Sequence, residues 1–260
     1  MPEVVRRLAC LVAFVLAFTF AGGATSVPRS GGQSMTDAER ATLAARVRDE
    51  FQFAWSSYKR LASGHDELNP VSRTAHDWYP PAVFYMTPVD ALDTMTLMGL
   101  TDETAATRQY LIEHLSFDQD ADVQVFEVTI RLLGGLLSAF QMSNDPKFLT
   151  LAEDLGTRLL PAFDSPTGMP YRFVNLRTGK TSDPLSNPAE IGTLMLEFGT
   201  LAKLTHRDVF YTKAKNAITQ VYRRRDPRTG LVGEVLVDAH DAVAIHRAAI
   251  GVAEELLTFQ

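Results

Sequence analysis

One glutamate lies inside an apolar run and is followed one helical turn later by an arginine. Glu127 and Arg131 belong to the segment Val125-Phe-Glu-Val-Thr-Ile-Arg-Leu-Leu-Gly-Gly-Leu136, which predicts a helix. Burial raises the pKa of a carboxyl group, and a carboxyl that keeps its proton near neutral pH can act as a general acid. The structural alternative is an i,i+4 ion pair between the two side chains, and the residues alone favour this alternative.

A second pair of acidic residues lies further along the chain. The sequence Asn187-Pro-Ala-Glu190 predicts a helix start, in which Glu190 would complete a capping box, again the favoured interpretation from the residues alone. Glu197 follows seven residues later, so the two carboxylates would share one helix face. Carboxylates on an otherwise apolar helix could accept hydrogen bonds from sugar hydroxyl groups.

Acidic residues also gather around the segment Gly64-His-Asp-Glu-Leu-Asn-Pro70. Asp90 and Asp93 follow it on the next predicted helix. The structural alternative for Asp90 is a negative charge near the helix N-terminus, which the helix dipole favours. The histidines show no metal-ligand spacing, and the sequence has no phosphate-binding loop and no Ser or Cys nucleophile motif.

Two glycines inside the Glu127 helix need an explanation of their own. Gly134 and Gly135 each cost a helix about 1 kcal/mol relative to alanine. Either a neighbouring helix packs closely there or a ligand approaches the backbone. Close helix packing is the favoured explanation.

The composition restricts the kind of protein that carries these residues. The 260 residues have a net charge of −6, which argues against a nucleic-acid-binding protein, since such proteins need a basic face. A single cysteine excludes a disulfide scaffold and a zinc site built on cysteines. The composition indicates a soluble globular protein.

The N-terminus has the features of a secretory signal peptide. Residues 1–24 combine a short basic segment, an apolar run and small residues suited to cleavage. An uncleaved signal anchor in the membrane is the alternative, whereas cleavage would leave no transmembrane span. Residues 25–35 are rich in Ser, Gly and Pro and indicate a linker. We therefore expect the secretory pathway: secretion or the periplasm for a bacterial protein, the ER or Golgi lumen for a eukaryotic one.

Helical periodicity dominates the rest of the chain. It predicts eight helices: 36–61, 87–99, 102–115, 122–142, 146–160, one from 188, one from about 208 to 225, and 241–259. A short strand is expected at 230–237, and long loops at 65–87 and 164–187. The fold class is all-α, as stacked hairpins or a helical toroid.

These segments resemble glycoside hydrolase family 47, the class I α-1,2-mannosidases. The matching blocks follow the family's order over about residues 50 to 235. They are 54–59 (AWSSYK), 64–72 (GHDELNPVS), 89–99 (VDALDTMTLMG), 126–139 (FEVTIRLLGGLLSA), 151–156 (LAEDLG), 160–163 (LPAF), 165–170 (SPTGMP), 174–176 (VNL) and 189–198 (AEIGTLMLEF).

The resemblance implies an (α/α)7 barrel, of which residues 36–260 would be the N-terminal part. It implies an inverting exo-mannosidase that trims mannose from high-mannose oligosaccharides or glycoproteins and holds a calcium ion. By the Phe-Glu-x-x-Ile-Arg motif, Glu127 matches the family's catalytic acid and Arg131 its sugar-contacting arginine; Glu190 matches a substrate contact. For Glu127 and Glu190 the resemblance thus favours the functional roles over the ion pair and the capping box that the residues alone favour.

Other family motifs have no match here, including those of two later acids and the calcium-holding threonine. The segment from Asp238 does not resemble the family's Asp-Ser-Tyr-Tyr-Glu-Tyr-Leu block. We expect a truncated or frame-shifted gene product, or a domain fragment, whose last ~20 residues are atypical. As this chain it would be an inactive mannosidase. The alternatives are a non-catalytic protein that binds mannose oligosaccharides, and a chain whose barrel a partner or longer isoform completes.

Overall fold

A computed structural model of the chain describes residues 35–237. The signal peptide expected at 1–24, nearly all of the linker and the helix expected at 241–259 lie outside the described residues. The chain divides into two compact units, residues 1–49 and 50–260. Helix α2 (Asp37–Leu61) begins in the first unit and ends in the second.

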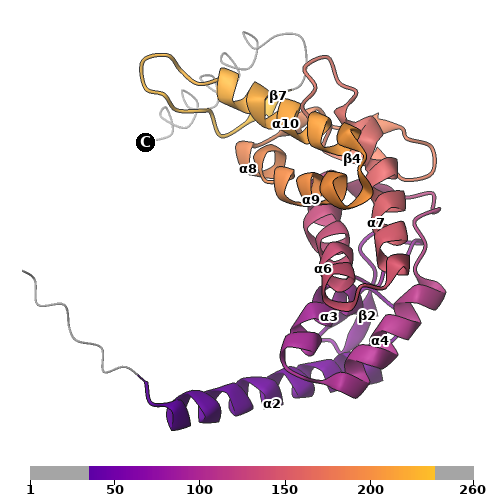
Figure 1. Cartoon of the computed structure of the whole chain (residues 1–260). Coiled ribbons are helices and arrows are strands. Elements are labelled where there is room, and N and C mark those ends of the chain that lie inside the picture. The colour runs from indigo at the N-terminus through magenta and orange to yellow at the C-terminus, as the bar shows by residue number, and fades with distance from the viewer. Residues whose placement is uncertain (1–34, 238–260) are drawn as a thin grey trace, which may run out of the picture. The chain divides into compact units, whose positions relative to one another are not determined.

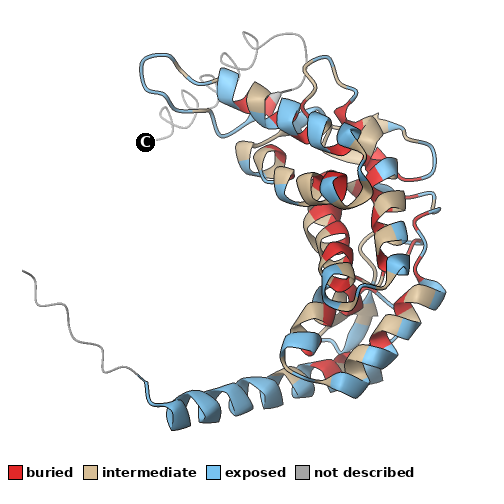
Figure 2. Cartoon of the chain, in the orientation of Figure 1, coloured by how far each residue is buried: buried red, intermediate tan, exposed pale blue. Residues whose placement is uncertain are grey.

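The first unit contributes the exposed opening turns of α2 (Figure 2). The predicted capping box is present there. The Glu39 backbone N–H donates to Thr36 Oγ1 at 3.2 Å, and the Thr36 N–H donates to Glu39 Oε2 at 2.8 Å. This reciprocal arrangement satisfies two donors that a helix start leaves free.

The second unit is built from helix hairpins, as the sequence predicts. Neighbouring helices pair as α3 (Met86–Leu97) with α4 (Thr101–His114), α6 (Gly134–Ser143) with α7 (Pro146–Leu159), and α9 (Met195–Thr205) with α10 (Asp208–Arg223). The first helices of these hairpins also touch in succession, α3 with α6 and α6 with α9 (Figure 1).

Large apolar side chains fill the space between these hairpins. Phe163 packs edge-on against Phe198, with ring centres 5.2 Å apart, and Phe198 lies 6.2 Å from Phe210. All three are buried. Aromatic burial of this kind is a large part of the free energy that holds such hairpins together.

The predicted helix at 122–142 begins later than expected. Residues 122–124 form strand β3 (Asp122–Gln124), which pairs antiparallel with β4 (Phe173–Asn175). The helix then runs as α5 (Val125–Val128), a π-helical turn at Thr129–Leu133, and α6. Periodicity could not show this strand, because its pairing partner is some fifty residues away in sequence.

This helix is long and apolar enough, over 125–143, to meet the length and composition of a membrane span. Its buried side chains include Leu132, Leu133 and Leu136. Since α6 packs against α3, α7 and α9, the apolar character is that of a core helix.

Three other sequence predictions differ from the structure. The helix from 188 is broken into α8 (Pro188–Gly192) and α9, with a turn at 193–194. The strand expected at 230–237 is confined to β7 (Leu236–Val237), which pairs with β6 (Leu185–Ser186). The two long loops contain short strands: β1 (Glu67–Asn69), β2 (Thr74–His76), β4, β5 (Thr181–Ser182) and β6.

Gly135 of α6 lies at a close contact with α3. A Cβ atom there would stand 2.6 Å from Val89 Cγ1 and 3.1 Å from the Val89 carbonyl oxygen. Gly134 has more room, since a Cβ there would meet Glu197 Cγ at 3.6 Å. The favoured explanation of the glycine pair, close helix packing, is therefore confirmed for Gly135.

Candidate active site

Glu127 and Arg131 form the centre of the candidate site. Arg131 Nε donates to Glu127 Oε2 at 2.9 Å, so the i,i+4 ion pair is present. The pair is not hidden in the core: 26% of the Glu127 side chain and 36% of the Arg131 side chain are exposed. A pair that is partly open to solvent can hold a carboxylate in place and still meet a ligand.

Asp90 approaches the same arginine from helix α3. Arg131 Nη1 lies 3.4 Å from Asp90 Oδ2. Burial raises the pKa of the Asp90 carboxyl, and the Arg131 charge opposes this while Asp93 and Glu127 add to it. The helix-dipole role considered for Asp90 is wrong, because α3 begins at Met86 and Asp90 falls after its first turn.

Two aromatic side chains from the loop before α3 adjoin the pair. The Arg131 guanidinium carbon lies 5.0 Å from the centre of the Trp78 ring, within the range of a cation–π interaction. The Tyr79 hydroxyl accepts a hydrogen bond from the Gln124 backbone N–H at 3.3 Å. Burial raises the pKa of Tyr79, and the charge of Glu127 adds to this.

Glu190 lies in a neighbouring group of polar side chains. Its carboxylate accepts from Ser186 Oγ at 3.2 Å and from Gln124 Nε2 at 3.4 Å, and Arg172 Nη2 stands 3.7 Å away. Asn187 Oδ1 caps the helix by accepting from the Glu190 N–H at 2.9 Å. The carboxylate of Glu190 thus faces β3 and the 172–186 segment instead of completing the expected capping box.

Gln124 joins the two groups. Its backbone N–H donates to the Tyr79 hydroxyl, whose pKa the Glu127 charge helps to raise. Its side-chain amide donates to the Glu190 carboxylate. Glu127 follows Gln124 by three residues, at the point where β3 becomes α5. The end of β3 therefore leads directly into the turn that carries Glu127 and also contacts Glu190.

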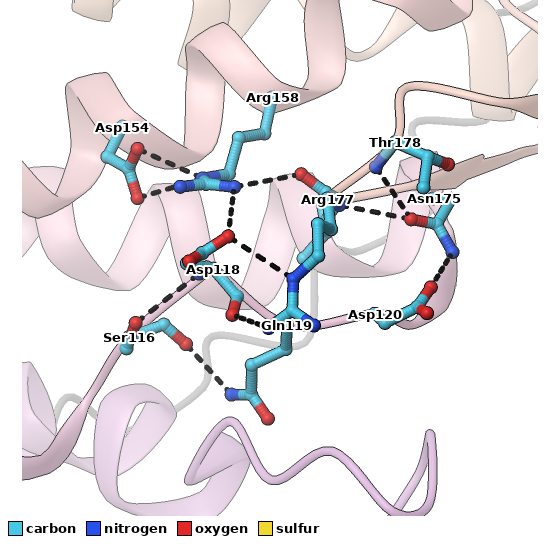
Figure 3. Close-up of polar contacts among 10 residues, drawn as sticks. Ser116, Asp118, Gln119, Asp120, Asp154, Arg158, Asn175, Arg177 and Thr178 are labelled. Carbon is cyan, nitrogen blue, oxygen red and sulfur yellow. Dashed lines mark hydrogen bonds and ion pairs between the residues drawn. The ribbon is translucent and has the colours of Figure 1, made fainter.

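A polar network anchors the segment that leads into β3 (Figure 3). Arg158 Nη1 donates to Asp118 Oδ1 at 3.3 Å, and Arg177 Nε reaches the same oxygen at 3.4 Å. Asn175 Nδ2 donates to Asp120 Oδ1 at 2.8 Å and to Asp122 Oδ1 at 2.9 Å. These contacts fix the start of β3 to α7 and to β4.

Glu197 does not join Glu190 in one group. It lies against Gly134, and its Oε2 is buried without a hydrogen-bond partner among the described residues. Burial raises the pKa of the Glu197 carboxyl. The expectation that both glutamates share one helix face is wrong, because the turn at 193–194 interrupts the helix.

Two cavities help to define what surrounds the site. A polar cavity of about 370 Å³ adjoins Tyr79 and β3; its lining is Tyr79, Pro80, Asp120, Ala121, Asp122 and Asn175. A larger, mostly apolar cavity of about 680 Å³ lies between the end of α2 and the β1–β2 hairpin. Neither cavity is lined by Glu127, Arg131 or Glu190, and of the two only the polar cavity shares a residue, Tyr79, with the candidate site.

The resemblance implies a calcium ion, for which acidic side chains are common ligands. Residues 35–237 contain no cluster of three or more His, Cys, Asp or Glu side chains that could hold a metal ion. No residue here is assigned to calcium.

Comparison with known proteins now decides the family. The sequence pattern of glycosyl hydrolase family 47 matches residues 50–253. The chain belongs to this family. The human endoplasmic reticulum mannosyl-oligosaccharide 1,2-alpha-mannosidase is 40% identical over 204 residues, which cover 77% of this chain and 29% of that protein. Mannosyl-oligosaccharide alpha-1,2-mannosidase IA of Spodoptera frugiperda is 40% identical over 206 residues, 72% of this chain and 31% of that protein.

A solved structure confirms the fold. The alpha-1,2-mannosidase from Trichoderma reesei superposes with a TM-score of 0.70 at 30% identity, over 76% of this chain and 44% of that one. The prediction of an all-α chain forming part of an α/α barrel is confirmed. The chain spans about a third of the length of these curated relatives.

Sequence reasoning missed Trp78, Tyr79, Gln124 and Arg172. The first two lie in the long loop at 65–87, whose length was the only signal of their importance. Gln124 and Arg172 meet Glu190 through the β3–β4 pairing. Nothing in their local sequence indicates that contact.

Proposed function

We propose that this chain carries the acid side and the first sugar contacts of an inverting exo-α-1,2-mannosidase that trims high-mannose oligosaccharides. The observation that supports it most is the group formed by Glu127, Arg131 and Asp90 beside the rings of Trp78 and Tyr79. Glycosidases work with carboxylates held at fixed positions, and sugars bind to planar polar groups next to aromatic rings.

Glu127 is the proton donor in this proposal. An inverting glycosidase protonates the oxygen of the leaving sugar with one carboxylic acid, while a second carboxylate activates water on the opposite face of the ring. Arg131 holds the Glu127 carboxylate through its Nε, which leaves the other carboxylate oxygen free of this bond. Arg131 also supplies guanidinium donors to a hydroxyl of the terminal mannose.

Glu190 is the substrate contact of the proposal. Its side chain is 15% exposed and already accepts from Ser186 and Gln124. A carboxylate oxygen has room for more than one donor, so a sugar hydroxyl can add to these bonds or replace one. Arg172 and Gln124 then provide donors to a sugar oxygen beside Glu190.

Calcium enters no step of this proposal. The resemblance implies a calcium ion that contacts the terminal mannose, and the described residues offer no cluster to hold it. Its role when bound would be to polarise and position sugar hydroxyls. The steps assigned to Glu127, Arg131 and Glu190 do not depend on it.

For the 260 residues by themselves we propose binding without hydrolysis. The motifs assign one catalytic carboxylate to this chain, Glu127, and inversion needs two, roughly 6.5–9.5 Å apart. A non-catalytic protein that recognises mannose-containing glycoproteins is the second candidate function, favoured by the same polar site. Because the human relative's name places that protein in the endoplasmic reticulum, the secretory pathway is the proposed location, with residues 1–24 as its signal.

Calorimetry and NMR of the purified chain test this proposal. Titration with α-1,2-mannobiose should show saturable binding, weakened in Glu190→Gln, and the proton spectrum should show no free mannose after prolonged incubation. α-1,6-Mannobiose is the matched control and should bind more weakly. Absence of binding would refute the sugar site. Release of mannose that stops in Glu127→Gln would refute the inactivity of the chain and support the role of Glu127.

A further inference from the structure

Two aspartates, Asp66 and Asp77, form hydrogen bonds across the loop that carries Trp78 and Tyr79. Asp66, from the segment Gly64–Pro70, is completely buried, and its backbone N–H donates to Asp77 Oδ1 at 3.0 Å. Asp77 Oδ2 lies 2.9 Å from His65 Nδ1. In return, Asp66 Oδ2 accepts from the Trp78 N–H at 3.0 Å. The two carboxylates thus join the two ends of the β1–β2 hairpin region.

The Asp66 carboxylate also holds the second half of the loop. Its Oδ1 accepts from the Phe84 N–H at 2.7 Å and lies 3.4 Å from the Met86 N–H. Burial raises the pKa of Asp66, while the backbone donors at Trp78, Phe84 and Met86 act in the opposite direction. Burying a carboxylate is costly unless it is well hydrogen-bonded, so these bonds are what makes the position tolerable.

Trp78 connects the Asp66 hydrogen bonds to the candidate site. The backbone of Trp78 is held by Asp66, and its indole ring faces the Arg131 guanidinium at 5.0 Å. Arg131 in turn orients Glu127 through a 2.9 Å hydrogen bond. A continuous chain of contacts therefore runs from the buried carboxylate of Asp66 to the proposed proton donor.

We propose that Asp66 is a positioning residue of the sugar site, which fixes Trp78 against Arg131 and thereby sets the geometry of the Arg131–Glu127 pair. This inference rests on the proposed function for its sugar ligand, but its geometric part does not. Asparagine cannot replace Asp66, because one of its two terminal atoms is an N–H₂ donor and would oppose a backbone N–H.

A ligand-free experiment tests the geometric part. The chain has two tryptophans, Trp55 and Trp78, so ¹⁵N labelling yields two indole N–H signals, assigned with Trp55→Phe. Trp55 donates to Glu103 at 2.9 Å and is the internal control. Arg131→Gln should shift the Trp78 signal in the unmodified chain and leave it nearly unchanged in an Asp66→Asn background. Equal shifts in both backgrounds would overturn the inference.

Binding of α-1,2-mannobiose tests the functional part. Asp66→Asn and Trp78→Phe should each lower the affinity by roughly three- to tenfold, the range of a partly desolvated cation–π contact. The double variant should bind no more weakly than Trp78→Phe alone, since both changes act through one contact. Full additivity, or an unchanged affinity in Asp66→Asn, would overturn the inference.

Two controls separate positioning from general destabilisation. Phe148→Leu, in the core of α7, should lower the melting temperature without weakening mannobiose binding. Asp77→Asn loosens the same loop and replaces Asp66→Asn in both experiments if that variant does not fold. If the unmodified chain does not bind mannobiose, the proposed function fails, and the indole experiment alone decides whether Asp66 positions Trp78.

Discussion

The guanidinium of Arg131 lies over the ring of Trp78, with 5.0 Å between the guanidinium carbon and the ring centre. The same guanidinium donates to Glu127 and reaches Asp90. One arginine thus connects a loop residue, the proposed proton donor and an acid of helix α3. Four of the predictions below follow from the surroundings of this arginine and of the helix that carries it.

Replacing Arg131 by glutamine should make stability more sensitive to pH. Arg131 is the charge that opposes the raised pKa of Asp90, so its loss lets burial and Glu127 raise that pKa further. A carboxyl whose folded-state pKa is raised contributes stability at low pH and loses it as pH rises through that pKa. The variant should therefore lose more stability at pH 8 than at pH 4. The difference between the two losses should be only about 1 kcal/mol, because solvent screens side chains that are partly exposed.

Thermal or urea unfolding of Arg131→Gln and the unmodified chain at both pH values checks this. Arg224→Gln, which removes hydrogen bonds to the uncharged Gln220, is the matched control and should not add pH dependence in this range. An Arg131→Gln loss that is the same at pH 4 and pH 8 would contradict the role assigned to Asp90.

Replacing Glu127 by glutamine should leave mannobiose affinity within about threefold of the unmodified value. The isosteric amide keeps an oxygen that can accept from Arg131, while it can no longer donate an acidic proton. In a family member with both carboxylates, the corresponding loss of general acid catalysis is on the order of 10²–10⁴-fold. Calorimetry on this chain checks the binding part, and an affinity loss of tenfold or more would indicate a binding role instead.

The two glycines of the Glu127 helix should respond oppositely to alanine. Gly135→Ala places a Cβ 2.6 Å from Val89 Cγ1 and should destabilise the fold by about 1–3 kcal/mol. Gly134→Ala meets nothing closer than 3.6 Å and should be neutral or stabilising, by up to about 1 kcal/mol, because alanine favours the helix. Urea unfolding measures both, and equal effects would refute the close packing of α3 and α6.

Replacing Glu197 by glutamine should flatten the pH dependence of stability. Burial raises the pKa of Glu197, so the stability it contributes is present below its ordinary pKa of 4.5 and is lost as pH rises through the folded-state value. The uncharged amide does not titrate and so makes no pH-dependent contribution to stability. Melting curves between pH 4 and pH 8 should show a smaller decline for the variant, and parallel curves would contradict this.

The helices were predictable from the sequence because their signals are local. The capping box at Thr36, Pro146 after Asp145 and the apolar spacing of α7 all lie within one or two turns of the helices they define. The strand at 122–124 was not predictable, since it exists through pairing with residues 173–175. The same holds for the break after α8, where two residues turn within an otherwise helical pattern.

The candidate site divides in the same way. Glu127 and Arg131 could be paired from their spacing, and the family motif adds their proposed roles along with that of Glu190. Trp78, Tyr79 and Gln124 meet this pair only through the folded loop and β3. The seven-residue spacing of Glu190 and Glu197 predicted one shared helix face, but the two residues lie on separate helices, α8 and α9.

An NMR titration with α-1,2-mannobiose tests the central claim most directly, using the Arg131 Nε–H and the indole N–H of Trp78 and Trp55 as reporters. The account predicts that the chemical shifts of the Arg131 and Trp78 signals change saturably while that of Trp55 stays constant. The changes with α-1,6-mannobiose should be smaller. If Arg131 and Trp78 remain unmoved at saturating mannobiose, or move no more than Trp55, the sugar site does not lie at the Glu127–Arg131 pair.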